Sequence, residues 1–170
     1  MEHFYNTIEG KFNFQDLYTD IVNWAKDDYY FLEMGAWRGC STAYMIVEII
    51  NSEKKIKFDV VDCFNDDSCN IFLDNLNTVS NYYNLVRGYS EMVSKKYKDE
   101  SLDFVFIDGN HDYDNIKLDI TSWLSKVKKG GIIAGHDYHD IVFPGVVQAV
   151  KEFFGNNYYV TKSGCWVFKK

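Results

Sequence analysis

Two short, largely apolar runs stand out in the second half of the chain. Residues 102–107 (LDFVFI) and 130–135 (GGIIAG) are typical of strands that are covered on both faces inside a parallel sheet. Between them, apolar residues recur at helical spacing, namely Tyr113, Ile116, Ile120, Trp123, Leu124 and Val127. This pattern predicts a strand, helix, strand crossover of ordinary length.

Acid and imidazole side chains follow both of these strands. Asp108 ends the first, with His111 shortly after it, and His136 and Asp137 end the second. Parallel strands joined by a crossover have their carboxyl ends on one edge of the sheet, and ligands of open α/β sheets bind outside that edge. We therefore expect these four side chains to converge on a ligand.

The alternation of strand and helix extends over the whole chain. Further strands are predicted at 29–34, 56–62 and 84–88, with helices at 14–26, 71–79, 91–97 and 146–154 and another that carries Ala43, Ile46, Val47 and Ile50. Two short runs at 158–161 and 165–168, joined by a Ser-Gly turn, predict an antiparallel hairpin. The fold class expected is α/β, with a mostly parallel seven-stranded sheet, helices on both faces and this C-terminal hairpin.

Length and composition favour one well-filled unit. The chain has 170 residues, of which 46% are hydrophobic and 18% aromatic. A chain of this size and composition can bury a substantial core that needs no disulfide or metal for stability. We find no repeat and no linker. The expected organisation is a single domain over 1–170, with an N-terminal helical segment at 1–28 and a core at 29–170.

Charge and cysteine use narrow the classes of partner. The formal net charge of -7 disfavours electrostatic binding to nucleic acid or to anionic membranes, so a small-molecule partner is expected. The 4 cysteines have neither the spacing of a zinc site nor that of a secreted disulfide framework. With no export signal and no apolar run of transmembrane length, the expected location is the cytoplasm.

A glycine-containing turn follows the first strand, in the sequence FLEMGAWRGCSTAYM. Gly35 and Gly39 flank the passage from strand to helix, where a missing side chain lets the backbone approach a ligand closely. Glu33 lies in the strand end and Asp62 at the end of the next strand. A carboxylate one β-α unit downstream is placed to accept hydrogen bonds from ribose hydroxyls, although Asp62 could also be a simple turn residue.

Together these motifs resemble a class I S-adenosylmethionine-dependent methyltransferase. The residues that carry the resemblance are Glu33-x-Gly35-x-x-x-Gly39-x-Ser41, Asp62, IDGNHDY, KKGGIIAGHDY, PGVVQAVKEFF and the closing hairpin. The likeness is to the small group related to catechol and macrocin O-methyltransferases, and it covers 31–169 in order. It implies a Rossmann-like methyltransferase fold and O-methylation of a small hydroxylated acceptor.

The resemblance also implies the roles of individual residues. Glu33, Gly35 and Ser41 would border the methionine end of the cofactor, Asp62 its ribose, and Tyr89 with Ser90 its adenine. Asp108 would face the sulfonium and the acceptor. The full cofactor set expected is Glu33, Gly35, Ala36, Gly39, Ser41, Asp62, Cys63, Tyr89, Ser90 and Asp108.

Metal-dependent relatives hold a divalent ion such as magnesium or manganese at the ends of the fourth and fifth strands. The matching residues here are Asp108, His136 and Asp137. His136 is a departure, because relatives usually have an acid there, and an imidazole makes the site less suited to magnesium. The sequence leaves metal use open.

Methyl transfer to a hydroxyl also needs a group that removes its proton. Asp108, His111 or His136 could take it, and His111 is the preferred base because it lies in the loop just past Asp108 and titrates near working pH. His111 could equally cap the following helix or bond a backbone carbonyl. The expected catalytic residues are His111 and Asp108.

Three other classes of function compete with this one. GNHD and GHDYHD are similar to metallophosphoesterase signatures, but the Asp-x-His expected near the first strand is absent. A nicotinamide-dependent oxidoreductase would require a tighter G-x-G turn. A non-catalytic module that binds a cofactor or a partner remains, because few loops are available to enclose an acceptor. Either the acceptor site is open or a second copy of the chain completes it as a homo-oligomer.

Overall fold

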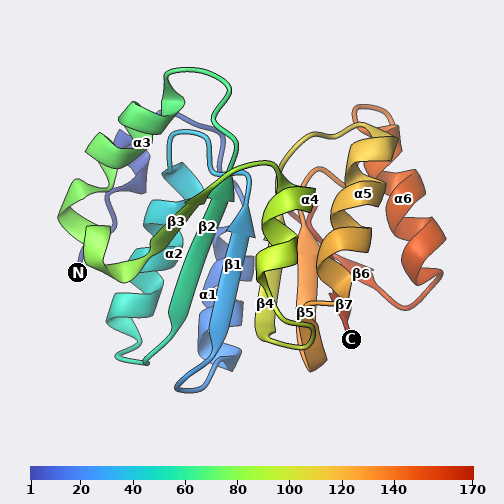
Figure 1. Cartoon of the computed structure of the whole chain (residues 1–170), viewed down its shortest axis with the longest axis horizontal. Coiled ribbons are helices and arrows are strands. Elements are labelled where there is room, and N and C mark those ends of the chain that lie inside the picture. Colours follow the sequence, from blue (N-terminus) through green and yellow to red (C-terminus); the bar gives the residue numbers. More distant parts are fainter.

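One sheet of seven strands forms the centre of the computed structural model, which describes residues 1–170 (Figure 1). The strands lie side by side in the order β3-β2-β1-β4-β5-β7-β6. Their bounds are Tyr30–Met34 (β1), Lys57–Asp62 (β2), Asn84–Arg87 (β3), Leu102–Ile107 (β4), Val127–Gly135 (β5), Tyr159–Val160 (β6) and Trp166–Lys169 (β7). The first five strands are parallel, and β7 pairs antiparallel with both β5 and β6.

Helices cover both faces of this sheet. One face carries α1 (Gln15–Trp24), α2 (Cys40–Asn51) and α3 (Ser68–Asn75), and the other carries α4 (Ser90–Val93), α5 (Tyr113–Leu124) and α6 (Pro144–Phe154). Short 3-10 turns occupy Tyr5–Thr7, Asn77–Tyr82 and Ser94–Lys96. None of the helices combines the length and the apolar composition required to span a membrane.

The alternation of side chains along the strands creates two separate cores. In β1, Phe31 packs among the residues of α1 and α2, whereas Leu32 packs on the opposite face with α5 and α6. All six residues of β4 are buried, because helices cover both of its faces. The same alternation directs the side chain of Glu33 to the face covered by α1 and α2.

The strand order places a topological switch point beside β1. This strand pairs with β2 on one side and with β4 on the other, so the chain leaves the carboxyl ends of β1 and β4 in opposite directions. A crevice forms at such a point in open α/β sheets, and it is the usual place for a ligand. The fold therefore fixes where the functional site should be sought.

The predicted fold class is confirmed, and the C-terminal hairpin is present. Two helices were predicted too long: 71–79 divides into α3 and the 3-10 turn at Asn77–Tyr82, and 91–97 divides into α4 and the 3-10 turn at Ser94–Lys96. Val127 was also assigned wrongly, because it does not belong to the helix that follows β4. That helix ends at Leu124, where the Lys126 N–H donates to the Trp123 carbonyl, and Val127 instead pairs with Leu102 at the start of β5. An isolated valine fits both helical spacing and a strand start, so periodicity alone could not separate the two.

Candidate functional site

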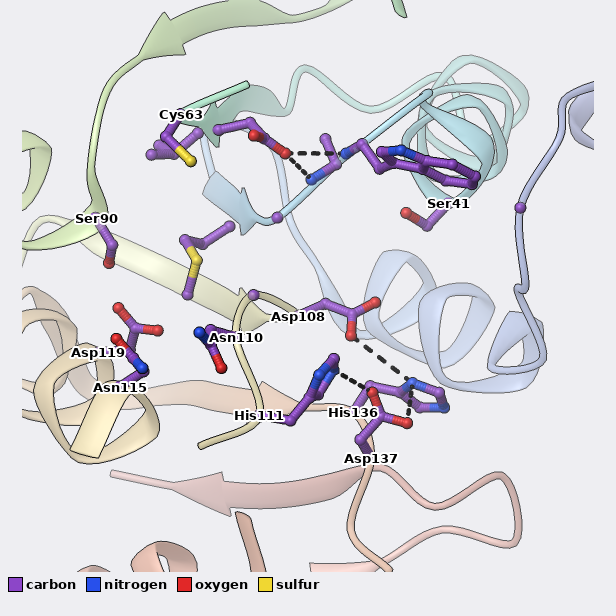
Figure 2. Close-up of a pocket in the computed structure, with 18 of the residues that line it drawn as sticks. Ser41, Cys63, Ser90, Asp108, Asn110, His111, Asn115, Asp119, His136 and Asp137 are labelled. Atoms are coloured by element: carbon purple, nitrogen blue, oxygen red, sulfur yellow. Dashed lines mark hydrogen bonds and ion pairs between the residues drawn. The ribbon is translucent and has the colours of Figure 1, made fainter. Parts of the chain in front are cut away.

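A cavity of about 1200 Å³ lies along the carboxyl edge of the sheet. Loops that follow all five parallel strands contribute to its wall, together with residues 10–13 of the N-terminal segment. Most of the predicted site residues line it, namely Gly35, Ala36, Ser41, Asp62, Cys63, Tyr89, Ser90, Asp108, His111, His136 and Asp137. The structure thus brings together the ends of strands that are far apart in the sequence (Figure 2).

Gly35 allows the backbone segments that follow β1 and β4 to approach each other closely at the cavity floor. Its φ is +87°, in the left-handed region, and a Cβ at this position would lie 2.1 Å from the carbonyl oxygen of Asp108. The Asp108 N–H donates to the Met34 carbonyl at 2.7 Å, which locks the two strand ends together. Only glycine satisfies both the backbone conformation and the close approach.

Asp62 at the end of β2 fixes the shape of the same turn. Its Oδ2 accepts hydrogen bonds from the backbone N–H groups of Ala36 at 2.7 Å and Trp37 at 2.9 Å, and its Oδ1 accepts one from Phe64 at 2.8 Å. An ionised carboxylate offers about four acceptor positions, so about one stays open toward the cavity. Asp62 therefore supports the turn and keeps acceptor capacity that a ligand hydroxyl could use.

Backbone strain gathers around this carboxylate. Trp37 and Phe64 have φ values of +45° and +46°, which are rare for bulky side chains. Such strain is typically held in place by surrounding contacts at functional sites. Here the three hydrogen bonds to Asp62 supply those contacts.

Glu33 does not line the cavity, contrary to its predicted place in the cofactor set. Its carboxylate is 1% exposed and accepts hydrogen bonds from the hydroxyls of Tyr18 at 2.9 Å and Ser41 at 2.6 Å, and also from Thr42. Burial raises the pKa of Glu33 to about 7, and the three hydroxyls oppose that rise. Glu33 instead holds Ser41 at the cavity wall.

Gly39 also lies outside the cavity wall, although it was predicted to contact the cofactor. It precedes α2 with a φ of +88°, and a Cβ on it would lie 3.1 Å from side-chain atoms of both Phe72 and Leu76. The reason for a glycine here is the close packing of the turn against α3 and the residue that follows it. A glycine pattern in a sequence does not distinguish approach by a ligand from approach by a neighbouring helix.

The four acid and imidazole residues at the ends of β4 and β5 do converge, as expected (Figure 2). His111 Nε2 lies 2.5 Å from Asp137 Oδ2. His136 Nδ1 lies 3.3 Å from Asp137 Oδ1 and 3.7 Å from Asp108 Oδ1. Asp137 has a φ of +60°, and this left-handed backbone turns its carboxylate between the two imidazoles.

The charges of these groups depend on one another. Burial raises the pKa of Asp108 to about 6, Asp137 raises it further, and the two imidazoles oppose the rise. For Asp137 the hydrogen bonds from His111 and His136 overcome burial, so its pKa falls well below the usual range. The hydrogen bond to Asp137 is the main cause of a raised pKa at His111. Burial lowers the pKa of His136, but the neighbouring acids outweigh it and the net change is upward.

The tightest group of metal-type ligands differs in one member from the predicted one. Single ligand atoms of Asp108, His111 and Asp137 all lie within 4.8 Å of one another, and His136 is not part of this group. His136 is half-buried beside Phe14, with the ring centroids 4.8 Å apart. The loop after β4 brings His111 into the place in the ligand group that the resemblance had assigned to His136.

Several cavity residues were missed in the sequence. The largest omission is Asp119, which projects from α5 into the cavity and is 6% exposed. A signal for it existed, because Asp119 lies among Ile116, Ile120 and Trp123 on the buried stripe of the helix. The other omissions include Gly10, Lys11, Phe12, Asn13, Trp37, Asn110, Asn115, Leu118, Val142 and Phe143. No periodic pattern marks the loop residues among them.

The sequence matches a known family over most of these elements. Residues 32–138 match the methyltransferase domain family, a span that contains the glycine turn, Asp62 and both strand ends of the cavity. The chain therefore belongs to this family, and its fold is that of the class I S-adenosylmethionine-dependent methyltransferases. No curated protein matches the sequence.

Solved structures show the same fold at low sequence identity. A protein from Corynebacterium glutamicum superposes with a TM-score of 0.74 at 11% identity, covering 97% of this chain and 84% of its own. The O-methyltransferase NovP superposes with a TM-score of 0.71 at 16% identity, covering 92% and 78%. The TDP-rhamnose 3'-O-methyltransferase CalS11, an enzyme of calicheamicin biosynthesis, gives 0.70 at 13% identity, covering 91% and 76%. These similarities establish the architecture of the chain.

Proposed function

We propose that this methyltransferase transfers the methyl group of S-adenosylmethionine to a hydroxyl of a small acceptor, with His111 as the base. The observation that carries the proposal is the pair formed by His111 and Asp137, 2.5 Å apart at the carboxyl edge beside Asp108. An imidazole oriented by a carboxylate is a common arrangement for removing a proton from a hydroxyl. Two O-methyltransferases among the similar structures support the acceptor class.

The cofactor is proposed to lie across the switch point. Its ribose hydroxyls meet the open acceptor position of Asp62, and its methionine end lies along the turn at Gly35 and beside Ser41. The sulfonium then lies near Asp108, between the two ends of the cavity. Tyr89 and Ser90 remain proposed contacts of the cofactor's adenine, and both line the cavity.

The reaction itself is an in-line displacement at the methyl carbon. A lone pair of the acceptor oxygen forms the new C–O bond as the S–CH₃ bond breaks, and its electron pair stays on sulfur to give S-adenosylhomocysteine. The acceptor proton passes to His111. Because Nε2 of this ring is held by Asp137, Nδ1 is the nitrogen proposed to receive the proton. The protein's main contribution is alignment of the two reactants.

Asp137 is proposed to position and charge-stabilise the base. Its carboxylate fixes the orientation of the His111 ring and favours the imidazolium that forms when the proton arrives. Phe143 also packs against that ring, with ring centroids 4.5 Å apart. Asp108, with a pKa of about 6, provides negative charge beside the sulfonium when it is ionised.

Magnesium or manganese assistance stays part of the proposal. The ligand atoms of Asp108, His111 and Asp137 are close enough to share one cation, and two carboxylates with an imidazole suit manganese better than magnesium. A cation held there would take His111 as a ligand, so it would replace His111 as the activating group by lowering the pKa of a hydroxyl bound to it. His136 would then remain outside the ligand group, as an imidazole adjacent to both acids.

The direct test is a transfer assay with methyl-labelled S-adenosylmethionine and a panel of sugars, catechols and other small alcohols, run with and without EDTA. We expect labelled product from at least one hydroxylated acceptor and its loss in His111→Ala. Loss of activity in EDTA, restored by manganese, would establish the cation; full activity in EDTA would exclude it. Cofactor binding without transfer to any acceptor would contradict the proposal and favour a non-catalytic module.

A further inference from the structure

Asp119 is a buried carboxylate that the proposed chemistry does not use. It lies on α5 at the end of the cavity away from the acid and imidazole cluster, on the same side as Ser90 and Asn115 (Figure 2). Its Oδ2 lies 3.8 Å from the position that a Cβ on Gly109 would occupy, so the side chain is directed toward the loop after β4. Burial raises the pKa of Asp119 to about 6.

The protein leaves this carboxylate only partly satisfied. A hydrogen bond from Ser90 opposes the rise in pKa, and no cationic side chain contributes. The Ser90 hydroxyl is itself fixed, because Trp123 Nε1 donates to its oxygen at 2.7 Å and leaves its hydrogen for Asp119. Buried carboxylates are costly unless they are well hydrogen-bonded, so the remaining acceptor capacity points to a donor from a ligand.

The position of Asp119 relative to the ribose site identifies that donor. Asp62 is the proposed ribose contact, and Cys63 follows it directly in the chain. Figure 2 shows Ser90 between Cys63 and Asp119 on the cavity wall. The base of a nucleoside bound at Asp62 therefore extends toward α5. Of the common purines, adenine presents an amino donor at its 6-position, whereas hypoxanthine presents a carbonyl acceptor there.

We infer that Asp119 accepts a hydrogen bond from the 6-amino group of the cofactor's adenine and so selects a 6-aminopurine over a 6-oxopurine. Asn115 lies one turn earlier on the same helix and also lines the cavity, which places an amide donor beside the carboxylate for a neighbouring ring nitrogen. Trp123 and Ser90 act as positioning residues for Asp119. The inference rests on the proposed function, because it takes the cavity to hold S-adenosylmethionine.

The experiment compares calorimetric affinities for S-adenosylhomocysteine and S-inosylhomocysteine, which differ at the 6-position. We expect the wild-type protein to prefer the adenosyl ligand by about a hundredfold or more, because the 6-oxo group would face a carboxylate with no proton to share. Asp119→Asn supplies an amide donor for the 6-oxo group, so the preference should shrink by at least about tenfold. The matched control is Asp114→Asn, an exposed position on the same helix that should leave the preference unchanged.

Ratios of affinity separate the recognition role from a merely structural one. If Asp119→Asn weakens both ligands by the same factor, Asp119 only supports the fold and the inference is wrong. If the wild-type protein binds both ligands equally, no residue selects at the 6-position and this inference alone fails. If the folded wild-type protein binds neither ligand, the assignment of the cofactor fails as well.

Discussion

The two ends of the cavity are built from different chemistry. At the end formed by β1 and β2, protein donors hold the acids in place: Asp62 accepts three backbone N–H groups and Glu33 accepts three hydroxyls. At the end formed by β4 and β5, Asp108, His111 and Asp137 face one another and the cavity, with few other partners. The first end is a fixed support, and the second is a group whose charges can change.

Under the proposed function, this difference corresponds to a division of work between holding the methyl donor and moving a proton. Backbone hydrogen bonds give a binding surface that does not need to reorganise, which suits alignment of a large cofactor. Coupled acids and imidazoles give proton acceptors near neutral pH, which suits the step at the hydroxyl. Substitutions at the two ends should therefore affect different measurements.

The largest expected effect follows from His111→Ala. Turnover should fall by about a hundredfold to ten-thousandfold, as is usual when a general base is removed, while affinity for S-adenosylhomocysteine changes little. The measurement is a transfer assay paired with calorimetry. His3→Ala serves as the control, because that imidazole pairs with Glu48 outside the cavity. A parallel loss of affinity and turnover would place His111 with the cofactor instead of the acceptor.

Gly35→Ala should destabilise the protein, because the new methyl group would clash with the backbone at the β1 end of the cavity. The added Cβ would lie 2.1 Å from a backbone oxygen, so we expect unfolding in urea to show a loss of about 3 kcal/mol or more. Gly130→Ala is the matched control: its φ is +79°, but nothing lies within 4 Å of the new Cβ. That variant should lose only about 1 kcal/mol. Equal losses of stability in the two variants would show that the close approach of Gly35 to the Asp108 backbone is not what requires a glycine here.

Glu33 should make stability depend on pH. Its pKa is raised to about 7 in the folded protein, so the folded state binds this proton more tightly than the unfolded chain does. The contribution to stability is thus greatest at low pH and is lost as pH rises from about 4.5 to about 7, by on the order of 2 to 3 kcal/mol. Urea unfolding at pH 5 and pH 8 should give a smaller difference for Glu33→Gln than for wild type. An identical pH dependence would contradict the raised pKa.

The strands and the strand-end residues could be predicted because one physical rule governs each. Strands buried on both faces need apolar runs, and the parallel order brings their carboxyl ends together, so the convergence of Asp108, His111 and Asp137 follows from the pattern. The pattern does not predict which side chains of the cluster lie closest to one another. Whether His111 or His136 completes the ligand group with the two acids depends on loop conformation, which has no periodic signature.

The sequence also could not predict which way a side chain points or which groups it hydrogen-bonds. The sequence places Glu33 near the turn, but only the packed structure shows that Tyr18 and α2 enclose it. Asp119 could have been noticed as an acid on an apolar helix stripe, yet a stripe does not tell whether such an acid meets a ligand or a protein donor. The surroundings of both acids depend on contacts between elements that are distant in the sequence, whereas sequence patterns describe only neighbours along one element.

The most direct test of the division between the two ends is a calorimetric titration with S-adenosylhomocysteine. Wild type should bind one equivalent, and Asp62→Ala should weaken binding by about tenfold to a hundredfold, because it removes a ligand acceptor and releases the turn at Ala36 and Trp37. Asp67→Ala, an exposed acid just beyond the same strand, should bind like wild type. No binding by the folded wild-type protein, or equal binding by Asp62→Ala, would contradict the account.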